Sequence, residues 1–243
     1  MSVKVDNAGK RPAVVRRNLT YAMLDAVGRT IVTGGYDGKP FPTEAELAKE
    51  HSVSRSVTRE AVKMLTAKGL LTARPRKGTS VQPASSWNLF DPDVLRWLLE
   101  RKFSLRLLRQ FNDLRIAIEP AAAALAAGAA DEAGLAAIAD GFRRMEAAER
   151  GEDEPLDADI AFHAAILEAS ANPFYSQFRD VVSTALQTSI RFTNRFAGRT
   201  ADIEAHRSVM SAIEARDPER ARAAMAAIIR EVMELIDNAE RTG

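Results

Sequence analysis

The chain has 243 residues, of which 46% are hydrophobic and 28% are charged, and its formal net charge is +1. It contains no run of about 20 apolar residues, so no membrane-spanning helix is predicted, and its N-terminus has no apolar segment typical of a secretion signal. The absence of cysteine excludes disulfides and thiolate metal sites. We therefore expect a soluble cytoplasmic protein with no membrane partner.

The small net charge conceals an uneven distribution along the chain. Residues 1–82 contain 15 lysines and arginines against 7 aspartates and glutamates, whereas the remaining 161 residues contain 19 against 26. This asymmetry predicts two domains with different partners, although chance clustering of charges is an alternative. A basic segment that also has the pattern of a folded domain favours nucleic acid as its partner.

The basic part begins with two predicted helices. Residues 1–17 are polar and aperiodic, which predicts a disordered arm, and apolar residues at helical spacing then predict a helix over residues 18–33. Thr43 stands three positions before Glu46, which is the capping-box offset of a second, short helix.

A third helix and a hairpin complete the predicted first domain. Ser54 is placed to cap a helix that runs to about Lys68 and ends at Gly69. Two short β-like runs, "LLTA" and "TSVQ", flank the segment "RPRKG" and predict a small hairpin. Helix, helix, turn, helix and hairpin is the order of a winged helix-turn-helix, here over residues 18–82.

The third predicted helix has two chemically different faces. At 100° per residue its polar residues share one arc and its apolar residues fill the opposite one. The polar arc comprises Arg55, Ser56, Arg59, Glu60, Lys63 and Thr66, and the apolar arc comprises Val57, Ala61, Met64 and Leu65. Arginine can bond guanine through two donors, and hydroxyls bond phosphates or base edges, so the polar arc suits a DNA groove. A solvated face with paired charges is the alternative.

The hairpin adds a second basic cluster. Arg74, Arg76 and Lys77 surround its predicted tip, where they suit the DNA backbone or the minor groove. Gly78 would let the main chain approach the DNA closely.

The second part of the chain reads as an all-α bundle over residues 91–240, after a linker over residues 83–90. Pro92 is placed for the first turn of a helix, and stretches rich in alanine and leucine follow without a β pattern. They predict helices over residues 104–129, 131–149, 155–170, 173–196, 200–215 and 218–240. The predicted fold class is therefore mainly α, a winged helix-turn-helix followed by a helical bundle.

Three polar residues of the bundle are candidates for a metal site. Asp159 and His163 lie four positions apart, so both project from one helical face, which they share with Phe162 and Ile166. His206 lies in a second apolar segment. Carboxylate and imidazole suit Zn, Ni, Mn or Fe, whereas histidines that are ordinary members of the core are the alternative.

Other polar residues of the bundle are candidates for binding an anionic effector. Arg115 lies in the mostly apolar segment "DLRIAIEP", and its forked guanidinium suits a carboxylate; an ion pair with Glu119, one turn on, is the alternative. Arg191 is a second candidate. Asn172, before a proline, is a third, and it reads equally well as a helix terminator.

The segment "FPTEAELAKEHSVSRSVTREAVKMLTAKGLLTARPRKGTSV" resembles the DNA-binding domain of the GntR family of bacterial transcription regulators, over nearly all of residues 18–82. The resemblance implies that the third helix reads an operator and that the wing tip enters the minor groove. Many relatives have an arginine where this chain has Ala45, so one contact of the second helix is missing or supplied elsewhere. The predicted DNA contacts are Thr43, Glu44, Arg55, Ser56, Arg59, Arg76, Lys77 and Gly78.

The segments "DPDVLRWLLE", "DLRIAIEPAAAALAA" and "DADIAFHAAILEASANP" resemble the FadR-type subgroup of that family, which has an FCD effector domain. The sequence of the first two segments further resembles regulators of sugar-acid catabolism, of the D-galactonate type. The resemblance implies that Asp159, His163 and His206 bind a divalent metal (Zn, Ni or Mn), with no organic cofactor. The family pattern has another histidine at the position of Ile228, so this chain offers three protein ligands at most.

These features predict a homodimeric transcription regulator rather than an enzyme. We expect a repressor that binds an inverted-repeat operator in double-stranded DNA and is released by a small carboxylate, with a sugar acid such as an aldonate favoured. One alternative is a metal-dependent hydrolase, which lacks an obvious general base beside its histidines. The other is a DNA-binding module whose helical domain only dimerises, which leaves the inward polar residues unexplained.

Overall fold

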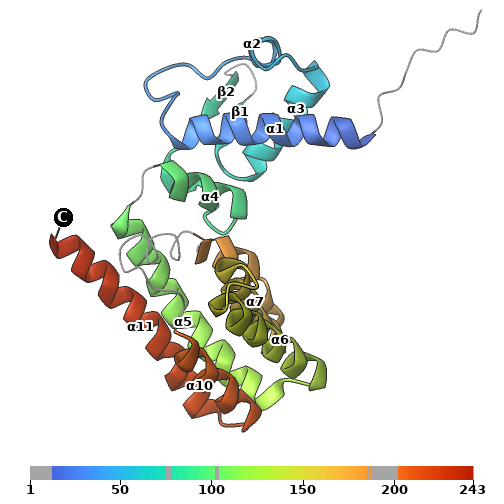
Figure 1. The fold of residues 1–243 in the computed structure, drawn as a ribbon. Coiled ribbons are helices and arrows are strands. Elements are labelled where there is room, and N and C mark those ends of the chain that lie inside the picture. Colours follow the sequence, from blue (N-terminus) through green and yellow to red (C-terminus); the bar gives the residue numbers. More distant parts are fainter. Residues whose placement is uncertain (1–12, 75–77, 102–103, 185, 188–201, 243) are drawn as a thin grey trace, which may run out of the picture. The chain divides into compact units, whose positions relative to one another are not determined.

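The fold is seen in a computed structural model that describes residues 13–74, 78–101, 104–184, 186–187 and 202–242 (Figure 1). The chain divides into two compact units between Arg101 and Lys102. Helices dominate both, and the described residues contain one sheet, a two-stranded antiparallel hairpin. The predicted fold class is confirmed. Within these ranges no helix is long and apolar enough to cross a membrane.

The first unit has the element order of a winged helix-turn-helix. Its elements are α1 (Ala13–Val32), α2 (Glu44–Glu50), α3 (Arg55–Ala67), β1 (Leu71–Arg74), β2 (Gly78–Val81), a 3-10 turn η1 (Ala84–Ser86) and α4 (Pro92–Arg101). Helix α1 begins before the predicted residue 18, so residues 13–17 are helical and do not belong to the predicted disordered arm. The strands pair in register from Leu71 opposite Val81 to Arg74 opposite Gly78.

The predicted caps set the bounds of helices α2 and α3. The amide of Thr43 donates to Glu46 Oε2 at 2.8 Å, and the Thr43 hydroxyl accepts from the Glu46 amide at 3.3 Å, which completes the capping box. The Ser54 hydroxyl accepts from the Val57 amide at 3.4 Å and caps α3. Gly69 follows α3 with φ +80°, and a Cβ at that position would lie 2.3 Å from the Ser86 carbonyl oxygen. Glycine is therefore required where the chain turns into the wing.

Helix α4 packs in the first unit through Trp97. The Trp97 side chain is fully buried in the same core as residues of α1 and α3. Its ring packs directly against Gly28 of α1, because a Cβ on Gly28 would lie only 2.3 Å from the ring carbons. The sequence predicts this helix in the domain of residues 91–240, whereas in the structure it belongs to the same compact unit as the winged helix-turn-helix. The sequence predicted the start of this helix at Pro92, but it did not show against which partner the helix packs.

The second unit is a bundle of antiparallel helices. Its described elements are α5 (Leu105–Ala129), α6 (Glu132–Glu149), α7 (Pro155–Ala169), α8 (Pro173–Ser176), helical residues 179–184 and 186–187, α10 (Ile203–Glu214) and α11 (Pro218–Thr242). Helix α5 runs along α11, and α6 along α7 (Figure 1). The single helix predicted over residues 173–196 is wrong in its first part, because a turn at residues 177–178 interrupts it; residues 188–196 lie outside the described ranges.

Small residues allow the helices of the bundle to approach closely. A Cβ on Gly141 of α6 would lie 2.8 Å from the Cα of Phe162 on α7, and alanines of α5 are fully buried in the same core. The core is otherwise apolar, but it encloses a group of buried polar side chains. These are Asn112, Arg115 and Glu119 of α5, Asp159 and His163 of α7, and His206 of α10.

Candidate functional site

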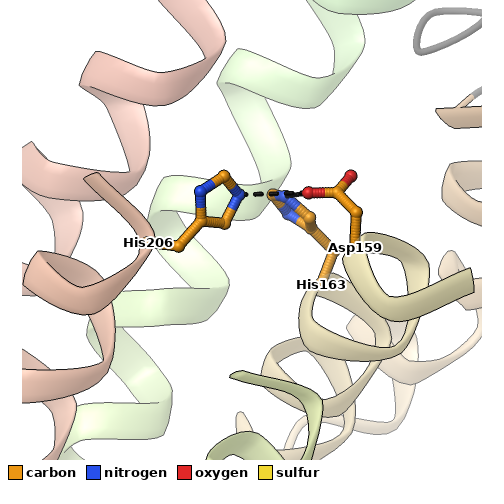
Figure 2. Close-up of side chains that lie close together, drawn as sticks. All are labelled: Asp159, His163 and His206. Carbon is orange, nitrogen blue, oxygen red and sulfur yellow. Dashed lines mark ion pairs between the residues drawn. The ribbon is translucent and has the colours of Figure 1, made fainter. Parts of the chain in front are cut away.

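Figure 2 shows Asp159, His163 and His206 brought together inside the helical unit. Helix α7 contributes Asp159 and His163, one turn apart, and α10 contributes His206. His206 Nε2 lies 3.2 Å and His163 Nε2 lies 3.8 Å from the same oxygen, Asp159 Oδ1. One ligand atom of each residue lies within 4.8 Å of the others. Among the described residues, no other group of three or more histidines, aspartates and glutamates has this spacing.

The 3.2 Å separation fits a bound cation, and the 3.8 Å separation is slightly longer than a cation would set. Ligand bonds of about 2.0–2.1 Å place neighbouring donor atoms about 3–3.5 Å apart. His206 Nε2 is buried and lies at ion-pair distance from Asp159 Oδ1, but the two atoms are not aligned for a hydrogen bond. A buried nitrogen without a well-aligned partner is costly, and a cation between that nitrogen and the carboxylate would satisfy both. The residues present therefore fit a divalent metal.

The other ring nitrogen of each histidine lies next to an oxygen. His206 Nδ1 is 2.6 Å from the main-chain oxygen of Asp202, and His163 Nδ1 is 2.6 Å from Glu119 Oε2. The His163 nitrogen is not aligned with that carboxylate for a hydrogen bond, so this contact is close but imperfect. Histidines that bind metals commonly present their second nitrogen to a carboxylate or a carbonyl, and both histidines here do so.

Glu119 also binds Arg115, its neighbour one turn earlier on α5. Arg115 Nε donates to Glu119 Oε1 at 2.5 Å and Arg115 Nη2 donates to Glu119 Oε2 at 3.2 Å. Arg115 Nη1 also donates to Asn112 Oδ1 at 3.3 Å. The two charged side chains are 2% and 1% exposed, so the pair is inside the bundle. This is the ion pair that the sequence left open as the alternative for Arg115.

The charges of this group offset the cost of burial. Burial raises the pKa of Glu119, but the positive charge of Arg115 and the contact with His163 outweigh it and lower the pKa to about 2. Burial likewise raises the pKa of Asp159, and the two histidines bring it below its ordinary value. Burial lowers the pKa of His206, and Asp159 more than reverses this, so the net shift is upward. Both carboxylates are therefore ionised at neutral pH, as metal binding requires.

The other predicted residues of the bundle have different surroundings. Asn172 caps the start of α8, with its side-chain oxygen accepting from the Phe174 amide at 3.0 Å, whereas the alternative that the sequence left open had it end the preceding helix. Ile228 of α11 is buried in the apolar core. Arg191 lies outside the described residues. Effector binding by Arg115, Arg191 or Asn172 stays a prediction.

The predicted DNA-binding face of α3 is exposed. Arg55, Ser56 and Arg59 are solvent-accessible, whereas Val57, Ala61 and Leu65 on the opposite face are buried, which confirms the two arcs. Arg59 Nε lies 3.3 Å from Glu44 Oε2 of α2, and the Arg59 side chain is still 65% exposed.

Strand β2 begins at Gly78, which has free space beside its Cα. Gly78 has φ +77°, and a Cβ there would have no neighbour within 4 Å. Arg76 and Lys77 lie outside the described residues, so the predicted DNA contacts of the wing tip stay predictions.

A winged helix-turn-helix with an exposed basic face, followed by a separate helical domain, is the architecture of a DNA-binding transcription regulator. The profile "Bacterial regulatory proteins, gntR family" matches residues 25–81, and that of the FCD domain matches residues 110–231. The chain belongs to the gntR family and carries an FCD domain, so it is a transcription regulator and not an enzyme.

Named relatives agree with this assignment. The chain is 34% identical to the HTH-type transcriptional regulator YieP of Escherichia coli K12, over 88% of this chain and 94% of the relative. It is 33% identical to the galactonate operon transcriptional repressor of the same organism, over 87% of this chain and 94% of the relative. The solved structure of E. coli McbR/YncC has the same fold, with a TM-score of 0.53 at 19% identity, over 91% of this chain and 98% of that chain.

Proposed function

We propose that the protein is a homodimeric repressor, acting in the cytoplasm, whose FCD domain binds a divalent cation through Asp159, His163 and His206 and a small hydroxy-carboxylate at the cation. The observation that carries the proposed metal site is the buried His206 Nε2, which lies 3.2 Å from Asp159 Oδ1 without an aligned hydrogen bond. The similarity to a galactonate operon repressor supports both the repressor role and a sugar acid as effector.

The donor set favours Zn, Ni or Mn. One carboxylate oxygen and two imidazole nitrogens are borderline or hard ligands, and the chain has no cysteine to add a soft one. Three protein ligands leave at least one coordination position for a small molecule, even in a four-coordinate site. Because Ile228 stands where the family pattern has another histidine, we assign that position to the effector.

A 2-hydroxy-carboxylate such as an aldonate suits this open metal. Its carboxylate and its neighbouring hydroxyl can bind one cation together, as oxygen ligands do at hard cations. The guanidinium of Arg115 is already paired with Glu119. We therefore assign the carboxylate of the effector to the metal rather than to Arg115. Arg115 contributes positive charge near the site, where it acts on both Asp159 and His206.

The DNA-binding unit supplies the other half of the proposed function. We assign base contacts to Arg55, Ser56 and Arg59 of α3, support to Thr43 and Glu44 at the start of α2, and minor-groove contacts to the wing at Arg76, Lys77 and Gly78. A winged helix-turn-helix reads one half-site, so a dimer would bind an inverted repeat. The effector releases DNA only if it binds the operator-free state more tightly, so effector and operator weaken each other's binding reciprocally.

The test is metal and effector binding by the wild type and by a matched pair of variants. Asp159→Asn removes a buried candidate ligand, and Asp140→Asn removes an exposed carboxylate of α6 that pairs with Arg143. We expect one metal ion per chain in the wild type and in Asp140→Asn, little in Asp159→Asn, and aldonate binding that requires the metal and lowers operator affinity. Metal-independent aldonate binding would contradict the proposed site, and the absence of binding by any hydroxy-carboxylate would contradict the effector class.

A further inference from the structure

We infer that Glu119 is a positioning residue of the metal site, which holds His163 by its Nδ1 edge so that Nε2 faces Asp159. Glu119 is not one of the three proposed ligands, and it lies on a different helix from all of them. The inference rests on the proposed metal site and adds to it the residue that would orient one of its ligands.

The geometry places one carboxylate between two cationic or proton-bearing groups. Glu119 Oε1 accepts from Arg115 Nε, while Glu119 Oε2 is 3.2 Å from Arg115 Nη2 and 2.6 Å from His163 Nδ1. Helix α5 thus presents an oxygen to the side of the imidazole that faces away from Asp159. The side chains of all three residues are at most 2% exposed, so water is a poor substitute for any of these contacts.

Arg115 determines what Glu119 can do for the histidine. A carboxylate paired with a guanidinium through both oxygens is ionised, and an ionised carboxylate only accepts hydrogen bonds. His163 Nδ1 lies 2.6 Å from Glu119 Oε2 but is not aligned with it for a hydrogen bond. We infer that this nitrogen carries the ring proton, because an ionised carboxylate favours a donor beside it. In the neutral ring the lone pair is then on Nε2, the nitrogen that lies 3.8 Å from Asp159 Oδ1 and that a cation would use.

Packing leaves the His163 ring few other orientations. The ring meets Phe162 edge to face, with centroids 5.8 Å apart, and it meets His206 in the same way at 5.5 Å. Aromatic contacts of this kind restrict tilt but do not choose between the two nitrogens. Glu119, which lies 2.6 Å from Nδ1, distinguishes the two nitrogens. A partner of this kind is typically worth 10–100-fold in metal affinity.

The experiment compares Glu119→Gln with Glu168→Gln. Glu168 lies on α7 and its exposed carboxylate pairs with Arg179, so its substitution removes an ion-paired carboxylate away from the site. Because Glu119→Gln strands the buried charge of Arg115, the double variant Arg115→Met/Glu119→Gln, which removes both charges, is measured beside it. Zn²⁺ affinity is read by competition with a chelator, and the state of each imidazole nitrogen by ¹⁵N NMR of the metal-free protein.

The chain has only three histidines, so each can be assigned. We expect His163 Nδ1 to be protonated in the wild type and in Glu168→Gln, an Nε2–H tautomer to appear in the Glu119 variants, and Zn²⁺ affinity to fall about 10–100-fold in them. Unchanged affinity in the folded Glu119 variants, or a wild-type His163 with its neutral-ring proton on Nε2, would overturn the inference. If the wild type binds no metal, the proposed site fails, while the NMR result still decides whether Glu119 sets the proton of His163.

Discussion

Trp97 Nε1 donates a hydrogen bond of 2.7 Å to Asp25 Oδ1, so a buried residue of α4 is bound to α1 within the first unit. Arg96 Nη2 donates to the same oxygen at 2.8 Å. We expect Trp97→Ala to destabilise the first unit by about 3–5 kcal/mol, because it removes a large buried side chain and leaves a cavity beside Gly28. Chemical denaturation followed by circular dichroism measures this change.

The control for Trp97 is Phe90→Ala, which truncates an aromatic side chain that is 57% exposed. It should change the free energy of unfolding far less. Equal effects of the two substitutions would mean that α4 does not depend on Trp97 for its packing.

Acid should weaken the first unit through Asp25 and Asp93. Burial raises the pKa of each carboxyl, but hydrogen bonds outweigh this and lower both: Trp97 and Arg96 bind Asp25, and Lys68 and Arg96 bind Asp93. A lowered folded-state pKa stabilises the fold above the unfolded value of 3.8, and that stability is lost as the pH falls through the folded value. We expect the melting temperature to fall below about pH 4, and less steeply in Asp25→Asn; an identical pH profile in that variant would contradict the role of Asp25.

Two glycines at similar positive φ provide a matched pair. Gly69 has φ +80° and Gly78 has φ +77°, but a Cβ on Gly69 would meet the Ser86 oxygen at 2.3 Å, whereas one on Gly78 meets nothing within 4 Å. Gly78→Ala should cost about 1–2 kcal/mol of strain, and Gly69→Ala should cost that amount and about 1–3 kcal/mol more for the collision. Equal melting temperatures of the two variants would show that the Ser86 contact is not structural.

Arg59 should contribute to operator affinity. Its guanidinium is exposed apart from the ion pair with Glu44, and a bidentate base contact is worth about 1–3 kcal/mol. We expect Arg59→Ala to weaken operator binding by that amount at fixed salt, measured by fluorescence anisotropy. The control is Arg143→Ala, which removes a similarly exposed arginine of α6; if both variants bind like the wild type, Arg59 is not a base contact.

The sequence was most informative where one helix contains the whole pattern. The two arcs of α3 and the caps at Thr43 and Ser54 are local, and the structure confirms them. The pair of Asp159 and His163 was visible because one helical turn separates them. The contact of Glu119 with His163 joins two helices, and no spacing along the chain encodes it; the nearest signal was the position of Glu119 one turn after Arg115.

The place of helix α4 bears on how the DNA-binding part is best produced by itself. A fragment that stops at the predicted linker would lack Trp97 and would open its slot beside Gly28 to water, which exposes apolar surface and favours aggregation. Such a fragment would also lack Asp91 and Asp93, which bind Lys68 Nζ at 2.7 and 2.9 Å at the end of α3. Expression of this part for spectroscopy or crystallisation should therefore continue through Arg101.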